Sequence, residues 1–403
     1  MKCVLHIGTE KTGSTLLQDW LYQNQVNLSR QRIFLSDVLS INNNRRLVSF
    51  FQWELDDWAN RNGILTQKDK DLYFTTFLND FAEEINAASD AHDLCIISSE
   101  HFHSRLRNYQ EIEPLQKYLE TVFDSVEIVC YFREQSQMAR SLYSTALKGP
   151  YTTTLERFVH GVNPDNYYYN HKLIADNWSR AFGKENTNFR IYDRKRFVDQ
   201  DIRRDLLACL PVKVNTKELD FSTVTSNESL SRLEGELYRV TNKIVPFWKE
   251  GNEEVNSLNV QIKNRISSID SLKQGDIVNS RKAVDPVLFK QANQEFFDAY
   301  FNGEYLFSTE NDGIDGEESD PVFTLEQLTE IIGDLFQSII KDGLSGDADW
   351  LRDLALKYET QEELTLDEAA KIMTLAGKAR PTGPFIRQKL CLLYTSPSPR
   401  DRG

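Results

Sequence analysis

Cysteine is scarce in the 403-residue sequence, and its five cysteines show no spacing typical of a metal site or a disulfide framework. Cys3, Cys95 and Cys130 each stand in a short apolar run, where a thiol behaves as a small hydrophobic side chain. A chain without a disulfide framework is typical of a reducing compartment, so we predict a cytoplasmic protein that holds no metal.

Long hydrophobic runs are missing as well. No apolar stretch approaches the ~20 residues that a helix needs to cross a bilayer, so we expect no membrane span. The apolar run 3–7 is too short for the core of a secretory signal, and a glycine follows it directly. Core material is nevertheless ample, since 40% of the residues are hydrophobic.

Positive charge is in short supply. The sequence has 47 Lys and Arg residues against 61 Asp and Glu residues, which gives a formal net charge of −14. A surface of this sign repels nucleic acid, so we expect no nucleic-acid partner. An anionic ligand would need a local cluster of basic groups against this background.

Three short and mostly apolar runs predict buried strands, at 4–7, 94–97 and 126–132, and residues 189–192 predict a fourth strand. Helical patterns lie between them, with one apolar stripe from residue 14 to 28 and another from 72 to 85. Alternating strands and helices are typical of a parallel sheet with helices on both faces. The fold class that we expect is therefore α/β.

The chain divides at an acidic segment. Between Ser308 and Pro321 there are six acidic residues and no Lys or Arg, which indicates a solvated linker. We therefore predict an α/β domain over 1–307, an acidic linker over 308–321 and a small C-terminal helical appendage over 322–390. The final segment, 391–403, resembles the translation of a sequencing adapter, so we expect it to be foreign and leave it out of the fold.

The most informative segment is a glycine-bounded loop directly after the first apolar run. Gly8 and Gly13 enclose the loop, Lys11 lies inside it, and the first helix opens with Ser14 and Thr15. Successive backbone N–H groups in such a loop form an anion-binding nest, and the helix N-terminus adds about half a positive charge. The nucleotide triphosphatase loop has its lysine after the second glycine, where this sequence has Ser14. The loop therefore predicts phosphate binding with a displaced lysine.

A second anion site follows the third apolar run. Arg133 comes directly after that run, at the carboxyl end of a strand, which is the edge where open α/β sheets bind ligands. Its guanidinium suits bidentate contact with a phosphate. Ser141 follows about two helical turns later, on nearly the same face of the next helix.

The Lys-Thr-Gly-Ser-Thr order at 11–15, followed by Arg133 and Ser141, resembles the sulfotransferases that use 3′-phosphoadenosine 5′-phosphosulfate (PAPS), in particular bacterial carbohydrate-sulfotransferase-like members. The resemblance covers residues 1–307 and implies a P-loop-type parallel sheet flanked by helices. It implies that Lys11 contacts the 5′-phosphate and the bridging oxygen to sulfur. It also implies that Arg133 and Ser141 hold the 3′-phosphate. The implied PAPS-binding residues are Lys11, Thr12, Gly13, Ser14, Thr15, Arg133 and Ser141.

The resemblance also implies the reaction, which is sulfuryl transfer from PAPS to an acceptor hydroxyl on a sugar or polysaccharide. A base must take the proton of that hydroxyl, and a cation must stabilise the charge on the leaving phosphate. Lys11 is the expected cation.

The candidate base comes from the end of the second apolar run. Glu100 is the first candidate, His101 the second and His103 the third. Glu100 also has two structural interpretations, as a helix-start carboxylate or as the partner of Arg105 or Arg107 in an ion pair. The sequence leaves these alternatives open.

Three further segments have two interpretations each. Residues 225–231 resemble the segment near the nucleotide in bacterial members of the family, and they fit a loop with a helix cap at Ser229 or Ser231 equally well. Residues 167–169 fit stacking on a sugar ring or ordinary packing. Residues 192–197 fit the path of an anionic acceptor or a solvated strand end.

Two other classes of function fit parts of the pattern. A P-loop kinase or nucleotide hydrolase needs a lysine after Gly13, which is absent, and an acidic Mg²⁺ ligand at a strand end, for which Glu100 is the candidate. A non-catalytic nucleotide-binding protein would keep the fold and need no base.

Overall fold

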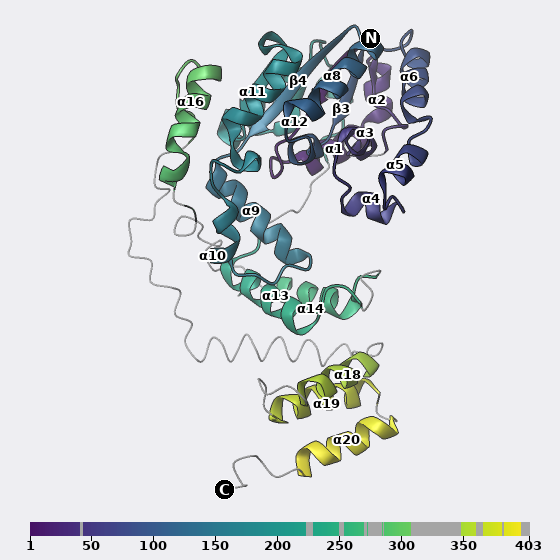
Figure 1. Cartoon of the computed structure of the whole chain (residues 1–403), viewed down its shortest axis with the longest axis vertical. Coiled ribbons are helices and arrows are strands. Elements are labelled where there is room, and N and C mark those ends of the chain that lie inside the picture. Colours follow the sequence, from purple (N-terminus) through teal and green to yellow (C-terminus); the bar gives the residue numbers. More distant parts are fainter. Residues whose placement is uncertain are drawn as a thin grey trace. The chain divides into compact units, whose positions relative to one another are not determined.

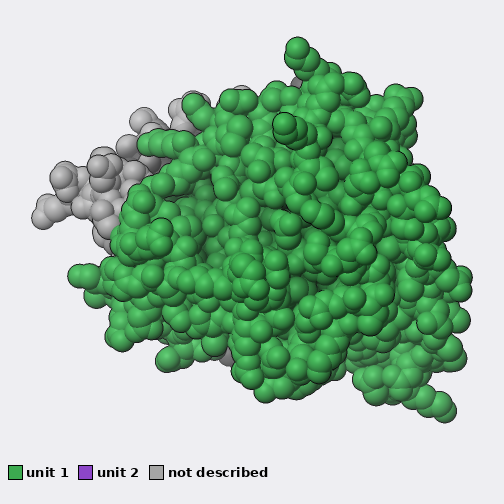
Figure 2. All heavy atoms as spheres, turned by 90° about the horizontal axis from the view of Figure 1, so that it is seen from above, with its two compact units in different colours: residues 1–143, 154–228, 279–313 green, residues 144–153, 229–278, 314–403 purple. Residues whose placement is uncertain are grey.

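The structure, a computed structural model, describes residues 1–40, 43–222, 229–249, 254–269, 272, 284, 286–307, 348–359, 366–380 and 383–395. These residues form two compact units. The first unit draws on 1–143, 154–228 and 279–313 and is green in Figure 2, and the second draws on 144–153, 229–278 and 314–403. Every site residue predicted from the sequence belongs to the first unit.

A five-stranded sheet forms the centre of the first unit, and all of its strand pairs are parallel. Its strands are β1 (Lys2–His6), β2 (Ile33–Phe34), β3 (Leu94–Ser98), β4 (Ser125–Phe132) and β5 (Thr187–Ile191), in the order β2-β3-β1-β4-β5. The predicted α/β fold with a parallel sheet is confirmed. The two-residue strand β2 was not predicted, because it is too short to show a pattern.

Helices surround this sheet (Figure 1). They are α1 (Ser14–Gln23), α2 (Gln25–Arg30), α3 (Arg45–Phe51), α4 (Asp57–Arg61), α5 (Gln67–Tyr73), α6 (Phe77–Ala88), α7 (His101–Arg105), α8 (Tyr109–Val122), α10 (Leu155–Phe158), α11 (His171–Phe182), α12 (Ile202–Ala208) and α16 (Lys290–Tyr300). The helix α9 (Gln135–Lys148) begins in the first unit and ends in the second.

Two of the predicted helices are each broken in two. The stripe from 14 to 28 is interrupted at Asn24, whose side-chain amide donates to the Trp20 carbonyl at 3.0 Å and competes with the helical backbone. The stripe from 72 to 85 is interrupted between α5 and α6, where the buried Phe74 ends α5. A capping box at Thr66 starts α5 five residues before that stripe begins.

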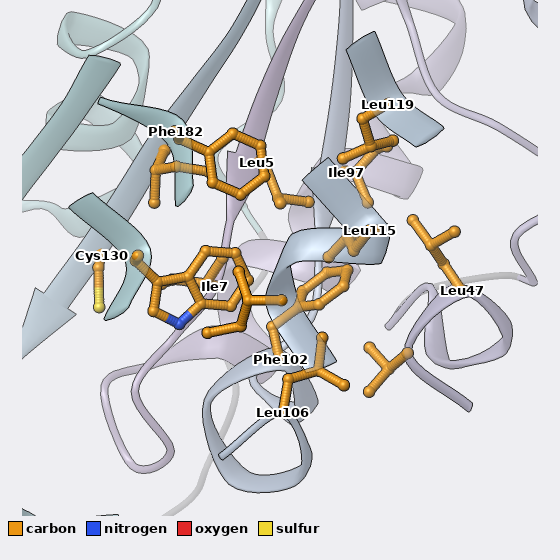
Figure 3. Packing of buried hydrophobic residues seen from close by; sticks show 14 of the residues in the cluster. Leu5, Ile7, Leu47, Ile97, Phe102, Leu106, Leu115, Leu119, Cys130 and Phe182 are labelled. Atoms are coloured by element: carbon orange, nitrogen blue, oxygen red, sulfur yellow. The ribbon is translucent and has the colours of Figure 1, made fainter. Parts of the chain in front are cut away.

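Separate apolar clusters cover the two faces of the sheet, because successive strand residues point to opposite sides. Leu5 and Ile7 belong to one cluster with α8 and α11, and Val4 belongs to the other with α1 and α12. Figure 3 shows the first cluster, in which the strand residue Ile97 gathers with Leu115 of α8. This layering leaves the carboxyl ends of the strands as the edge from which the site loops emerge.

The second unit is helical in its described parts. Its helices are α13 (Arg232–Ile244), α14 (Ser257–Ser267), α18 (Ala348–Glu359), α19 (Leu366–Ala379) and α20 (Pro384–Thr395). The last three lie where a helical appendage over 322–390 was predicted, and α20 continues past 390 to Thr395, into the segment expected to be foreign. Residues 229–278, expected inside the α/β domain, also fall in this unit. The predicted linker 308–321 lies outside the described residues.

The interior of α13 and α14 is held by polar contacts. The side-chain nitrogen of Asn242 lies 2.8 to 3.0 Å from the carbonyls of Leu147, Gly149 and Tyr151, so one buried amide ties α13 to the end of α9 and the segment directly after it. Across the described residues of both units, none of the helices combines the length and the apolar character needed to cross a membrane.

Candidate functional site

The loop after β1 is held in place by β4. The backbone N–H of Thr9 donates to the Tyr131 carbonyl, and the N–H of Tyr131 donates to the Gly8 carbonyl, each at 2.9 Å. Gly8 has a φ of 89°, and a β-carbon there would stand 2.9 Å from the Cα of Glu100. Glycine is therefore required at this position for both its conformation and its close approach to the segment after β3.

The end of the loop opens α1. Gly13, at the N-cap, has a φ of 74° and offers no side chain to cap the helix, which leaves the first N–H groups of α1 without a side-chain acceptor at that position. The buried Thr12 turns its hydroxyl inward to the Thr9 carbonyl. Ser14 is buried and Thr15 is exposed. The loop therefore presents chiefly backbone groups, as an anion nest does.

Arg133 lies beside this loop. Its Nη1 donates to the carbonyl of Lys11 at 2.9 Å, and its guanidinium carbon is 5.2 Å from the centre of the Tyr192 ring. Its Nε is buried and finds no hydrogen-bond partner in the part of the chain that the structure describes. Burial lowers the pKa of Arg133 from its ordinary value. The structure thus brings together the two basic residues that the sequence placed in separate anion sites.

Ser141 lies in α9, the helix that begins two residues after Arg133, and its side chain is half-buried. Its assignment to the 3′-phosphate stays a prediction. Residues 225–228, the core of the third sequence segment, lie outside the described residues. Ser231 caps α13 by accepting from the backbone N–H of Glu234 at 3.1 Å, which confirms the capping interpretation for that residue.

Glu100 stands between β3 and α7, next to the loop. Its Oε2 accepts from Nε2 of Gln18 in α1 at 2.7 Å, and its side chain is 18% exposed. It makes no side-chain cap contact with α7. Arg105 pairs with Asp56 at 2.7 Å, and Arg107 lies 3.8 Å from Glu54. The interpretation of Glu100 as the ion-pair partner of either arginine is therefore wrong. Glu100 does stand at the start of α7, at its N-cap position, as the helix-start interpretation expects.

His101 is the second candidate base. Its Nε2 lies 4.0 Å from Oε1 of Glu100, and its Nδ1 is buried without a hydrogen-bond partner among the described residues. Burial lowers the pKa of His101, while Glu100 opposes that shift and Arg45 adds to it. The net direction is downward, so the ring is neutral at pH 7 and able to accept a proton.

His103 is enclosed rather than exposed to the site. Its Nε2 lies 3.0 Å from the Tyr168 carbonyl, and its Nδ1 lies 3.4 Å from the backbone nitrogen of Glu10. Burial lowers the pKa of His103 to about 4. Both ring nitrogens are therefore engaged in holding the loop, which makes His103 a positioning residue.

Glu10 is a loop residue that the sequence analysis missed. Its carboxylate accepts from the Tyr168 hydroxyl at 2.8 Å. Burial works to raise its pKa, but its polar neighbours Ser104 and His103 and the hydrogen bond from Tyr168 outweigh burial and lower it. An acidic residue inside a phosphate loop was the one available signal. Of the tyrosines at 167–169, Tyr168 therefore supports the phosphate loop through its hydroxyl.

These features define an α/β protein in which a glycine-bounded loop, an arginine and a Glu–His pair meet at the carboxyl edge of a parallel sheet. No protein family model matches the sequence, and no solved structure matches it. An uncharacterized protein of Archaeoglobus fulgidus is 26% identical over 247 residues, which are 61% of this chain and 64% of the relative. The chain thus spans slightly less than two thirds of that relative.

Proposed function

We propose that the protein transfers the sulfuryl group of PAPS to an acceptor hydroxyl on a carbohydrate. The observation that carries the proposal is the 2.9 Å contact between Arg133 and the Lys11 carbonyl. Lys11 and Arg133, which the family resemblance assigns to the 5′-phosphosulfate and the 3′-phosphate of PAPS, are therefore in direct contact. The geometry, the loop backbone and the resemblance support the proposal together.

The 5′-phosphosulfate would bind the loop. Three of its residues, Gly8, Lys11 and Gly13, have positive φ values of 89°, 66° and 74°, and left-handed residues of this kind occur in backbone anion nests. The N-terminus of α1 adds its partial positive charge at the same place. Lys11 supplies the full charge that a phosphate needs in a chain with a net charge of −14.

The 3′-phosphate would bind Arg133. A guanidinium has five N–H donors, and the Lys11 carbonyl occupies only Nη1. The contact with Tyr192 holds the plane of the guanidinium, so that its remaining donors are pre-organised for a phosphate. Ser141, further along α9, would add a hydroxyl donor.

The chemistry follows from these positions. The acceptor hydroxyl loses its proton to Glu100 or His101 as its oxygen forms a bond to sulfur. The bond between sulfur and the bridging oxygen breaks, and adenosine 3′,5′-bisphosphate leaves with the electron pair. Lys11 stabilises the negative charge that grows on the bridging oxygen. Atoms and charge balance without a further reactant.

A nucleotide kinase or hydrolase of the P-loop class is the second candidate, because Gly8 and Gly13 have the spacing of that class. Two observations favour sulfuryl transfer over it. The lysine stands at position 11 instead of after Gly13, and Glu100, the candidate Mg²⁺ ligand, accepts a hydrogen bond from Gln18. A non-catalytic nucleotide-binding protein would share the nucleotide site but would not need the Glu–His pair.

The test is a transfer assay with PAPS labelled in its sulfuryl group, run against a panel of carbohydrate acceptors with and without EDTA. We expect label on an acceptor and equal rates in both conditions. ATP labelled in its γ-phosphate is the matched control. Transfer or hydrolysis of the γ-phosphate that depends on Mg²⁺, with no sulfuryl transfer, would replace the proposal with the kinase or hydrolase alternative.

A further inference from the structure

A cleft of about 350 Å³ opens in the first unit beside α7. Two chain segments form its walls, one following α3 and one joining α7 to α8. Its lining includes Trp53, Glu54, Asp56, Arg105, Arg107 and Asn108. None of them belongs to the phosphate loop or to the arginine site. All but Trp53 carry a charged or amide side chain, which is unlike the lining of a pocket for an apolar ligand.

The base of the cleft is fixed by one carboxylate. The buried Glu111 accepts from the backbone N–H of Trp53 at 3.1 Å and from that of Arg107 at 3.0 Å. It also accepts from the side-chain amide of Asn108 at 2.8 Å. These bonds join the two walls, so the side chains at the mouth stand on a rigid frame.

A second set of charges closes the side next to α7. Asp56 accepts from Nε of Arg105 at 2.7 Å and also pairs with Arg45. Burial works to raise the pKa of Asp56, but Arg105 and Arg45 outweigh it and lower it to about 2. Asp56 is thus ionised and fully engaged, so this side of the cleft is a structural wall.

The groups left at the mouth are an aromatic ring and planar polar side chains. The Trp53 side chain is 60% exposed, whereas Trp20 and Trp178 are fully buried in the core. Glu54 and Arg107 lie 3.8 Å apart and are both mostly exposed, so their charges balance. An exposed indole face beside planar hydrogen-bonding groups suits a ring with one apolar face and hydroxyls at its rim. A neutral sugar has these properties.

The cleft lies close to the proposed transfer site. His101 begins α7 and Arg105 ends it, and four residues of helix rise about 6 Å. Arg105 and Arg45, which pair with Asp56 in the wall of the cleft, are also close enough to His101 to act on its pKa. A ligand in the cleft therefore lies at the same edge as Glu100, roughly one helical turn from the candidate base.

We propose that this cleft binds the sugar chain of the acceptor, with one ring stacked on Trp53 and hydrogen-bonded to Glu54, Arg107 and Asn108. The neighbouring ring then presents its hydroxyl to Glu100 and His101. This inference rests on the proposed function and adds the acceptor site to it. Because the two positions are separated, an acceptor of at least two rings is required for full binding.

The test compares Trp53→Ala and Trp53→Phe with the wild-type protein. Saccharides of increasing length are first chosen on a glycan array and then titrated by calorimetry against the protein saturated with adenosine 3′,5′-bisphosphate. We expect oligosaccharides to bind at least tenfold more tightly than their single sugars. We also expect Trp53→Ala to remove at least tenfold of that affinity and Trp53→Phe to restore part of it. Leu72→Ala, which removes another exposed apolar side chain, is the control and should change nothing.

A second variant and the nucleotide titration separate the possible failures. Arg107→Ala should weaken oligosaccharide binding while the affinity for adenosine 3′,5′-bisphosphate stays within twofold. If no saccharide on the array binds, or if Trp53→Ala and Arg107→Ala both bind as the wild type does, the acceptor site is wrong, while nucleotide binding still supports the transferase. A wild-type protein that does not bind adenosine 3′,5′-bisphosphate would instead overturn the proposed function.

Discussion

Lys11 has a backbone conformation that is unusual for a residue with a side chain. Its φ is 66°, in the left-handed region that costs about 1–2 kcal/mol for residues other than glycine. The bond from Arg133 to its carbonyl holds this conformation. In the proposed complex, the backbone around Lys11 and its ammonium group would act on the same phosphosulfate.

Lys11→Ala should remove the cation without removing the loop. We expect turnover to fall by roughly 10²–10³-fold, since one preorganised charge-stabilising donor contributes that much to catalysis. The free energy of unfolding should stay within about 0.5 kcal/mol of the wild type, as for a surface substitution. Initial rates with labelled PAPS and urea unfolding measure the two effects. Lys2→Ala, an exposed lysine on β1, is the control, and near-normal turnover of Lys11→Ala would exclude Lys11 from the mechanism.

Glu100 and His101 compete for the role of base, and matched substitutions decide between them. Glu100→Gln and His101→Asn each keep a similar shape and remove a proton acceptor. The variant that lacks the base should lose roughly 10²–10⁴-fold in turnover. Its affinity for adenosine 3′,5′-bisphosphate should be unchanged, because neither side chain belongs to a phosphate site. If both variants turn over normally, neither residue is the base.

If His101 is the base, the dependence of turnover on pH should follow the protonation of its ring. Burial lowers the pKa of His101, so the neutral form that accepts a proton persists below the usual titration range of histidine. Turnover should therefore decline at low pH with a midpoint below 6.5, the ordinary pKa of histidine. A decline centred above pH 7 would contradict this assignment.

At the scale of elements, the site depends on contacts between segments that are far apart in the sequence. Tyr168, in the 3₁₀ turn 167–169, reaches Glu10 in the phosphate loop, and His103 of α7 lies against both. Gly8 packs against Glu100 in the same region. The loop is therefore fixed from the side of β3 as well as from β4.

Tyr168→Phe tests this support. Removing the hydroxyl leaves the Glu10 carboxylate with one hydrogen bond fewer, which should lower the free energy of unfolding by about 1–3 kcal/mol. The affinity for adenosine 3′,5′-bisphosphate should also fall, because the loop is less ordered. Tyr109→Phe, whose hydroxyl bonds Glu113 on the surface of α8, should change neither quantity. Unchanged stability and affinity in Tyr168→Phe would show that the contact does not support the loop.

The sequence predicted the elements that leave a local pattern. The strand at 94–97 is an unbroken apolar run, and the strand at 126–132 is apolar apart from Glu127, because both faces of these strands are covered. The structure places β3 and β4 there. The break at Asn24 and the early start of α5 were missed. In both places a side chain that hydrogen-bonds the backbone, Asn24 or Thr66, sets a helix boundary that the apolar stripe does not mark. The contact between Glu10 and Tyr168 joins residues 158 positions apart, and a single sequence holds no signal for it.

For the molecule as a whole, three buried histidines link stability to pH. Burial lowers the pKa of His6 and of His103 to about 4 and that of His171 to about 3. Their folded pKa values lie below the ordinary value, so the unfolded chain binds protons that the folded chain does not. The stability contributed by the neutral rings is complete above pH 6.5 and is lost as the pH falls toward 4.

We therefore expect the free energy of unfolding to fall by about 1.4 kcal/mol per pH unit for each histidine below about pH 6. Urea unfolding at pH 7, 6 and 5 measures this slope. His92, which is on the surface beside Ser29, provides the control. His92→Gln should leave the slope unchanged. A stability that does not change between pH 7 and 5 would contradict the buried, neutral state of these rings.

The first unit contains every residue of the proposed transfer. The proposal requires that this unit binds one nucleotide through both of its phosphates. Calorimetric titration of adenosine 3′,5′-bisphosphate and adenosine 5′-phosphosulfate into the wild type and Arg133→Ala tests this requirement. Because Arg133 also supports the loop through the Lys11 carbonyl, both ligands should lose some affinity in Arg133→Ala. We predict that the loss is at least tenfold larger, by about 1.4 kcal/mol, for the bisphosphate than for the ligand without a 3′-phosphate. Equal losses for the two ligands, or tighter binding of ATP than of the bisphosphate by the wild type, would contradict the account.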